Sequence, residues 1–113
     1  MLWGEIGITS IKFDTSFQSL CENPTTKRSF LESCTASLEN PLVQCYDCYE
    51  GPVIILYTGK VSEVQKVTNK IMENGNIEIE GFGVLPIIGK SEPSDAIIDE
   101  IESNGFDVIE IGN

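Results

Sequence analysis

The chain has 113 residues, which is enough for one hydrophobic core, and a formal net charge of −11 from 18 acidic and 7 basic side chains. Such an excess of negative charge disfavours binding to nucleic acid and to anionic membrane surfaces. Histidine is absent, so the commonest general base and the usual catalytic triads are missing. We therefore expect a single non-enzymatic domain, 1–113.

The location of the protein is predicted from two absent signals. No apolar run approaches the roughly 20 residues that span a bilayer. The first residues have neither the basic start nor the apolar centre of a secretory signal. We expect a cytoplasmic protein.

The first half of the chain predicts strands on either side of one helix. Residues 2–10 alternate loosely between apolar and polar side chains and indicate a strand. No sustained period follows in 12–27, so this segment is expected to be a long connection, with a short helix at 16–20. A capping-box pattern and an apolar stripe predict a helix over 27–39, and a short strand at 42–46 follows it.

The second half predicts strands and helices in alternation. Residues 52–57 are β-branched or aromatic and indicate a central strand that begins at Pro52. The clearest helical stripe of the chain lies in 61–72, and 77–88 reads as one strand. A third helix opens at 91–94 and ends at Gly105, before a last strand at 106–111. This order predicts an α+β fold, with a mixed, mostly antiparallel sheet and helices packed on it.

Four cysteines, Cys21, Cys34, Cys45 and Cys48, are expected to be reduced thiols, because no export signal accompanies them. Cys45 and Cys48 form a Cys-x-x-Cys pair. Residues three apart on a strand point to opposite faces, so this pair can act together only if the chain turns between them. No helix follows the pair, which disfavours a thioredoxin-like site, and a zinc site would also need both remaining cysteines.

Three segments carry a resemblance to a known family: 36–40 (ASLEN), 51–61 (GPVIILYTGKV) and 84–86 (VLP). In the order of its elements and in these segments, the chain resembles the bacterial microcompartment shell-protein domain. The resemblance is strongest over 33–86. It implies a structural subunit that forms hexameric or pseudohexameric rings and joins other shell proteins in a microcompartment shell.

The resemblance also implies a central pore, lined by the turn between the second and third strands. On this chain that turn is Cys48, Tyr49, Glu50 and Gly51. Some members of the family bind a 4Fe-4S cluster through a cysteine there, and Cys48 is the nearest counterpart, with one more residue before Gly51. The alternative for Cys48 is a small, partly buried apolar residue. For Tyr49 and Glu50 the alternatives are a cation-favouring aperture and ordinary turn residues.

Two features depart from the family pattern. Ser37 stands where the family commonly has an edge lysine that helps rings to join, so tiling into sheets is not implied. The connection 12–27 is longer than usual, and it and the tail 105–113 have no counterpart from which a role could be transferred.

Two other function classes stay open from the sequence. The first is a regulatory module that binds a small molecule, with the connection 12–27 closing over the ligand. The second is an acidic inhibitor of a nucleic-acid-binding protein. Enzymatic activity ranks last, because no acid, base and nucleophile come together in the sequence.

Overall fold

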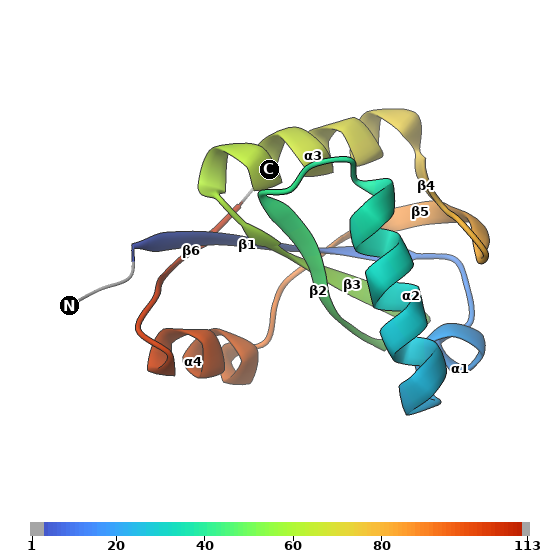
Figure 1. The fold of residues 1–113 in the computed structure, drawn as a ribbon, viewed down its shortest axis with the longest axis horizontal. Coiled ribbons are helices and arrows are strands. Elements are labelled where there is room, and N and C mark those ends of the chain that lie inside the picture. The colour runs from blue at the N-terminus through green and yellow to red at the C-terminus, as the bar shows by residue number, and fades with distance from the viewer. Residues whose placement is uncertain (1–3, 112–113) are drawn as a thin grey trace.

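Six strands and four helices follow one another in residues 4–111, the part of the chain that the computed structural model describes (Figure 1). They confirm the predicted α+β class. The strands are β1 (Glu5–Phe13), β2 (Val43–Glu50), β3 (Val53–Gly59), β4 (Asn76–Ile79), β5 (Gly83–Ser91) and β6 (Asp107–Glu110). The helices are α1 (Phe17–Leu20), α2 (Pro24–Ser37), α3 (Val61–Asn74) and α4 (Asp95–Ser103).

Strand β1 forms the centre of a curled sheet with the order β2-β3-β1-β5-β4. It is antiparallel to β3 and β5, while β6 pairs in parallel with its first half. Strands β1 and β2 are therefore parallel with β3 between them, which is a split β-α-β arrangement. Phe13 lies opposite Val53. The β2–β3 turn and α1, which follows β1, consequently lie at the same end of the sheet.

The two faces of the sheet bury different side chains. Helices α2 and α3 cover the larger core, which contains Ile11 and Phe13 of β1. Helix α4 lies on the opposite face (Figure 1), where Ile101 packs against Ile8 and Leu56. The side chains of β1 alternate between the two cores with the period of two that a strand imposes. Helix α4 covers only one end of this face of the sheet, so the β5 side chains on the same face remain exposed to solvent.

Helix α2 begins three residues earlier than the sequence predicts. The carboxamide of Asn23 accepts hydrogen bonds from the backbone N–H of Thr25, at 2.9 Å, and of Thr26, at 3.2 Å. Pro24 occupies the first turn, where its missing N–H costs nothing. Asn23 and Pro24, which fall in the predicted connection 12–27, are thus a helix start. At α4, by contrast, the predicted start is confirmed, because the Ser94 hydroxyl accepts from the Ile97 N–H.

Two predicted strands have different bounds in the structure. The segment 77–88 is a hairpin, in which β4 and β5 pair through a turn at 80–82. Gly81 and Gly83 adopt positive φ values of 84° and 92°, which glycine tolerates best. The turn residue Phe82 packs edge-on against Phe30 of α2, with 5.3 Å between ring centroids. The first strand runs three residues past its predicted end to Phe13, and residues 2 and 3 of the prediction lie outside the described residues.

The largest buried side chain carries a hydroxyl group without a partner. Tyr57 of β3 is fully buried in the core beneath α2 and α3, and its phenolic oxygen finds no hydrogen-bond partner among the described residues. Burial raises the pKa of the Tyr57 phenol above its ordinary value of 10.0. The folded state therefore requires the neutral phenol, so its stability falls as the pH rises above 10.0, where the unfolded chain ionises.

We expect Tyr57→Phe to raise the free energy of unfolding by about 1 kcal/mol, because it removes a buried polar group that has no partner. The gain should increase above pH 10.0, where only the wild-type phenol ionises on unfolding. Urea unfolding at pH 7 and at alkaline pH measures both effects. Tyr46→Phe is the control, since Tyr46 is 36% exposed, and it should change neither value. A loss of stability in Tyr57→Phe would contradict the assignment.

Candidate functional site

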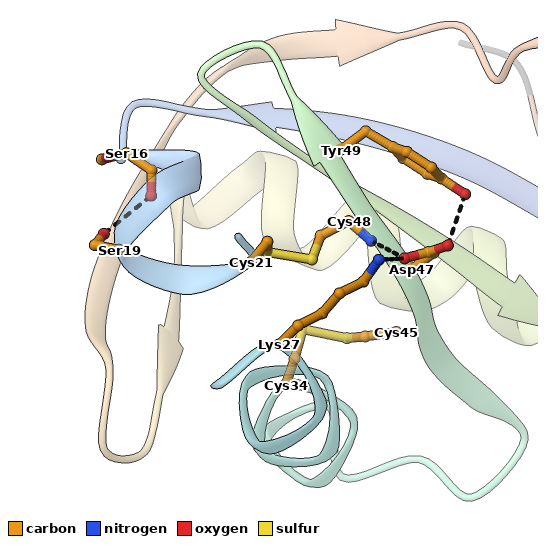
Figure 2. The surroundings of a disulfide bond; sticks show 9 residues. All are labelled: Ser16, Ser19, Cys21, Lys27, Cys34, Cys45, Asp47, Cys48 and Tyr49. Atoms are coloured by element: carbon orange, nitrogen blue, oxygen red, sulfur yellow. Dashed lines mark hydrogen bonds and ion pairs between the residues drawn. A yellow bond between two sulfur atoms is a disulfide. The ribbon is translucent and has the colours of Figure 1, made fainter. Parts of the chain in front are cut away.

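The four cysteines form two disulfide bonds, Cys21–Cys48 and Cys34–Cys45, with Cα atoms 6.5 and 6.0 Å apart (Figure 2). Both bonds join the helical segment 21–34 to strand β2, and we call them the disulfide clasp. All four side chains are at most 5% exposed. The prediction of reduced thiols is therefore wrong for the structure, because the fold brings two pairs of cysteines together that are far apart in sequence.

A β-bulge allows both ends of the Cys-x-x-Cys pair to take part. Cys45 lies opposite Tyr57, and Asp47 lies opposite the next residue of β3, Leu56, so Tyr46 is an extra residue in β2. The insertion shifts the alternation by one position. Cys45 and Cys48 therefore enter the same core, although three residues on a regular strand would point them to opposite faces. The bulge had no signal in the sequence.

Strand β2 forms an edge of the sheet, and side chains occupy its outer hydrogen-bond donors. The hydroxyl oxygen of Thr35 on α2 accepts from the Cys45 N–H at 2.9 Å. The carboxylate of Asp47 accepts from the Cys48 N–H at 2.8 Å. An open edge with free N–H groups would invite pairing with another chain. The clasp and these two contacts close this part of the edge.

Asp47 is the central residue of a small polar cluster beside the clasp (Figure 2). Its carboxylate lies 2.6 Å from the Lys27 ammonium and accepts a hydrogen bond of 3.0 Å from the Tyr49 phenol. Burial, and next the negative charge of Asp47, raise the pKa of Tyr49 well above its ordinary value. Tyr49 therefore stays a neutral donor at physiological pH. The cluster fixes β2 and offers no activated nucleophile.

The structure separates the four residues predicted to line a pore. Cys48 and Tyr49 belong to strand β2, and only the exposed Glu50 at the end of the strand and Gly51 lie at the β2–β3 turn. Cys48 is 1% exposed and Tyr49 packs with the α4 core. The predicted strand 42–46 thus continues to Glu50, and β3 starts one residue after Pro52.

Two observations bear on the predicted iron-sulfur site at Cys48. The Cys48 sulfur is bonded to Cys21, so it cannot be a thiolate ligand in this state. Residues 4–111 also contain no group of three or more His, Cys, Asp or Glu side chains that could hold a metal. Both observations argue against a cluster at Cys48, and the alternative of a small buried residue describes its environment better.

The predicted long connection 12–27 contains α1 and the first turn of α2. Helix α1 lies beside the β2–β3 turn, and the two border an open cleft of about 480 Å³. Cys21, directly after α1, is bonded to Cys48, two residues before the end of β2. The connection is therefore fastened next to the predicted pore turn. The cleft is lined by Ser16, Phe17, Gln18, Glu50, Gly51 and Pro52.

A larger groove, of about 1030 Å³, lies between α2, α3 and β4 and does not include the clasp. Ser37 lines it, and its hydroxyl donates to the Cys34 carbonyl at 2.7 Å. The charged side chains of the groove are exposed and of both signs, so they do not converge on one ligand group. They are Glu39, Lys66, Lys70, Glu78 and Glu80.

Comparison of the chain with models of protein families, with curated proteins and with solved structures finds no match in any of the three. The family resemblance accordingly rests on the residues quoted from the sequence. Among the described residues, no helix is long and apolar enough to cross a membrane.

Proposed function

We propose that the protein is a non-enzymatic, ring-forming subunit of a bacterial microcompartment shell, with the β2–β3 turn at the ring axis. The observation that carries the proposal is the position of segment 51–61. This segment includes Gly51 of the β2–β3 turn, strand β3 and the first residue of α3, and it is the longest of the three segments that carry the resemblance.

The turn has the chemistry of an aperture. Glu50 is exposed at the end of β2, and Gly51 follows it without a side chain. Around a symmetry axis each Glu50 would be repeated, and a ring of carboxylates attracts cations and repels anions. The chain charge of −11 acts in the same direction. Small cations and neutral metabolites are therefore the species that such an opening would pass.

An uncovered apolar surface supports contact between copies of the chain. Val84 is 56% exposed and Ile88 is 53% exposed, both on β5, and Pro86 between them is exposed too. Helix α4 covers the other end of this face. Contiguous apolar side chains in contact with water favour a protein interface. A neighbouring subunit that covers them would bury this row.

The two disulfide bonds of the clasp must be compatible with the proposed location inside a cell. Disulfide bonds are rare in a reducing cytoplasm, although intracellular proteins of hyperthermophiles do contain them. A shell subunit with this fold must therefore keep or form its two bridges inside the cell. Trapping of free thiols with an alkylating reagent at lysis, followed by mass spectrometry, should find Cys34 and Cys45 unmodified.

Sedimentation velocity of interface variants tests the proposed assembly. Ile88→Lys places a charge in the apolar row of β5, and it should convert the oligomer to monomer, because a buried unpaired charge is strongly unfavourable. Met72→Lys is the matched control: Met72 is 38% exposed on α3, which covers the opposite face of the sheet, and its variant should sediment like the wild type. If both variants assemble equally, β5 is not part of the interface. A monomeric wild type would contradict the proposed function.

One observation favours a second candidate, a regulatory module that binds a small molecule. The groove between α2, α3 and β4 is large enough for a metabolite. The connection 12–27 lies at the other end of α2 and is fastened by Cys21, so it would not act as the lid. A monomer whose melting temperature rises with a metabolite would support this candidate.

A further inference from the structure

Helix α1 is too short to be stable by itself. It has four residues, and no side chain caps its N-terminus at Ser16. Two hydrogen bonds lie at its ends: the Cys21 N–H donates to the Phe17 carbonyl at 2.7 Å, and the Ser19 hydroxyl donates to the Ser16 carbonyl at 3.0 Å. Because isolated helices below about 12 residues are marginal in water, attachments to the rest of the fold must hold α1 in place.

Those attachments are two apolar side chains and one covalent bond. Leu20 is 5% exposed and Phe17 is partly buried, and both pack on the large core. The covalent bond is Cys21–Cys48, which fixes the C-terminal end of α1 to β2 just before the turn (Figure 2). Ser16 before α1, and Glu22 and Asn23 beyond Cys21, are exposed. The bridge is thus the strongest single restraint on the position of α1 beside the turn.

The second bridge restrains a segment that is already secured. Cys34 lies in the interior of the 14-residue helix α2. This helix has the Asn23 cap at its start, the fully buried Phe30 in its middle, and the contact from Thr35 to β2. Removal of Cys34–Cys45 would therefore leave α2 in place locally. The two disulfide bonds therefore restrain different helices, α1 and α2, although both attach to strand β2.

We propose that Cys21–Cys48 is a reducible latch: while it is closed, α1 is held against the β2–β3 turn, and its reduction releases α1 from the turn. The regulatory consequence rests on the proposed function, because only at a ring axis would release of α1 alter a pore. The first half of the cleft lining, Ser16 to Gln18, would then move away from Glu50 and Gly51. Reduction of Cys21–Cys48 would therefore change the width of the proposed pore.

The reductant is a small thiol of the glutathione type, present in two equivalents. One thiolate attacks a sulfur of Cys21–Cys48 and forms a mixed disulfide, which releases the other cysteine as a thiolate. A second reductant thiolate then displaces the remaining cysteine and leaves as oxidised reductant. Two electrons pass to the protein, and both cysteines take up protons. Both side chains are at most 3% exposed, so the attack requires a local opening of α1.

Hydrogen exchange measured by mass spectrometry tests the latch. In Cys21→Ser/Cys48→Ser, amide exchange in 17–21 should be roughly a hundredfold faster than in the wild type, as expected for the loss of a disulfide restraint. Exchange in β1 and β3 should remain slower than in 17–21, because these strands exchange only through unfolding of the whole domain. Cys34→Ser/Cys45→Ser is the matched control, and its 17–21 peptides should exchange as slowly as those of the wild type. Glutathione added to the wild type, with alkylation to count reduced cysteines, should reproduce the first variant.

Two outcomes would overturn the latch. The first is unchanged protection of 17–21 after full reduction of Cys21–Cys48. The second is fast exchange in β1 and β3 together with loss of the circular dichroism signal, which would make the bridge a staple for the whole fold. Neither outcome depends on oligomeric size, so they are distinct from a failure of the proposed function, which shows as a monomeric wild type.

Discussion

Reduction of both bridges of the clasp is expected to lower the free energy of unfolding by about 6 kcal/mol. The bonds close loops with sequence separations of 27 and 11 residues. Loop-closure entropy assigns about 3.5 kcal/mol to the longer loop and about 2.8 kcal/mol to the shorter one. Because domains have stabilities of only about 5 to 15 kcal/mol, the reduced chain should be close to unfolding at 37 °C.

Urea unfolding followed by circular dichroism, with and without a phosphine reductant, measures the effect. Each double variant, Cys21→Ser/Cys48→Ser and Cys34→Ser/Cys45→Ser, should lose about half of the total and remain folded. The variant with all four cysteines replaced is the control for the reductant, which should not change its midpoint. Identical midpoints for oxidised and reduced wild type would show that the clasp contributes no stability.

Gly59→Ala is expected to destabilise the fold by about 3 kcal/mol through steric overlap at the crowded end of β3. Gly59 lies between Val43 of β2 and Gly7 of β1. A Cβ atom there would overlap the Leu42 carbonyl oxygen and lie 2.9 Å from the Val43 Cα, and both are backbone atoms that cannot rotate away. The same carbonyl accepts from the Lys60 N–H at 3.0 Å, so the start of α3 would shift as well.

Gly89→Ala is the matched control for this substitution. Gly89 is also a strand glycine, opposite Lys12 of β1, and a Cβ atom at this position would have no heavy atom within 4 Å. The free energy of unfolding of this variant, obtained from its thermal midpoint, should lie within about 0.5 kcal/mol of the wild-type value. Equal midpoints for Gly59→Ala and Gly89→Ala would contradict the close approach of β2 to β3.

The sequence predicts best those elements whose signal is local. The apolar stripe of α3 is confirmed, and the helix ends where Gly75 adopts φ 77°. The start of α3 at Val61 has no side-chain cap. The strand from Val53 to Gly59 is confirmed as a central strand, since its residues are apolar on both faces.

The candidate site depends on features that no local pattern encodes. One extra residue, Tyr46, decides that Cys45 and Cys48 share a face, and pairing with Cys34 and Cys21 requires the tertiary packing of α1 and α2 on β2. The sequence therefore located the important segment but assigned its cysteines the wrong chemical state. The position of the β2–β3 turn beside α1 likewise follows only from the strand register.

We propose that copies of this chain meet around an axis at the β2–β3 turn. Light scattering of the oxidised protein over a range of concentrations measures the molar mass on which this proposal depends. We expect a hexamer of about 74 kDa, six times the 12.4 kDa of one chain. A mass of one or two chains at every concentration would contradict it.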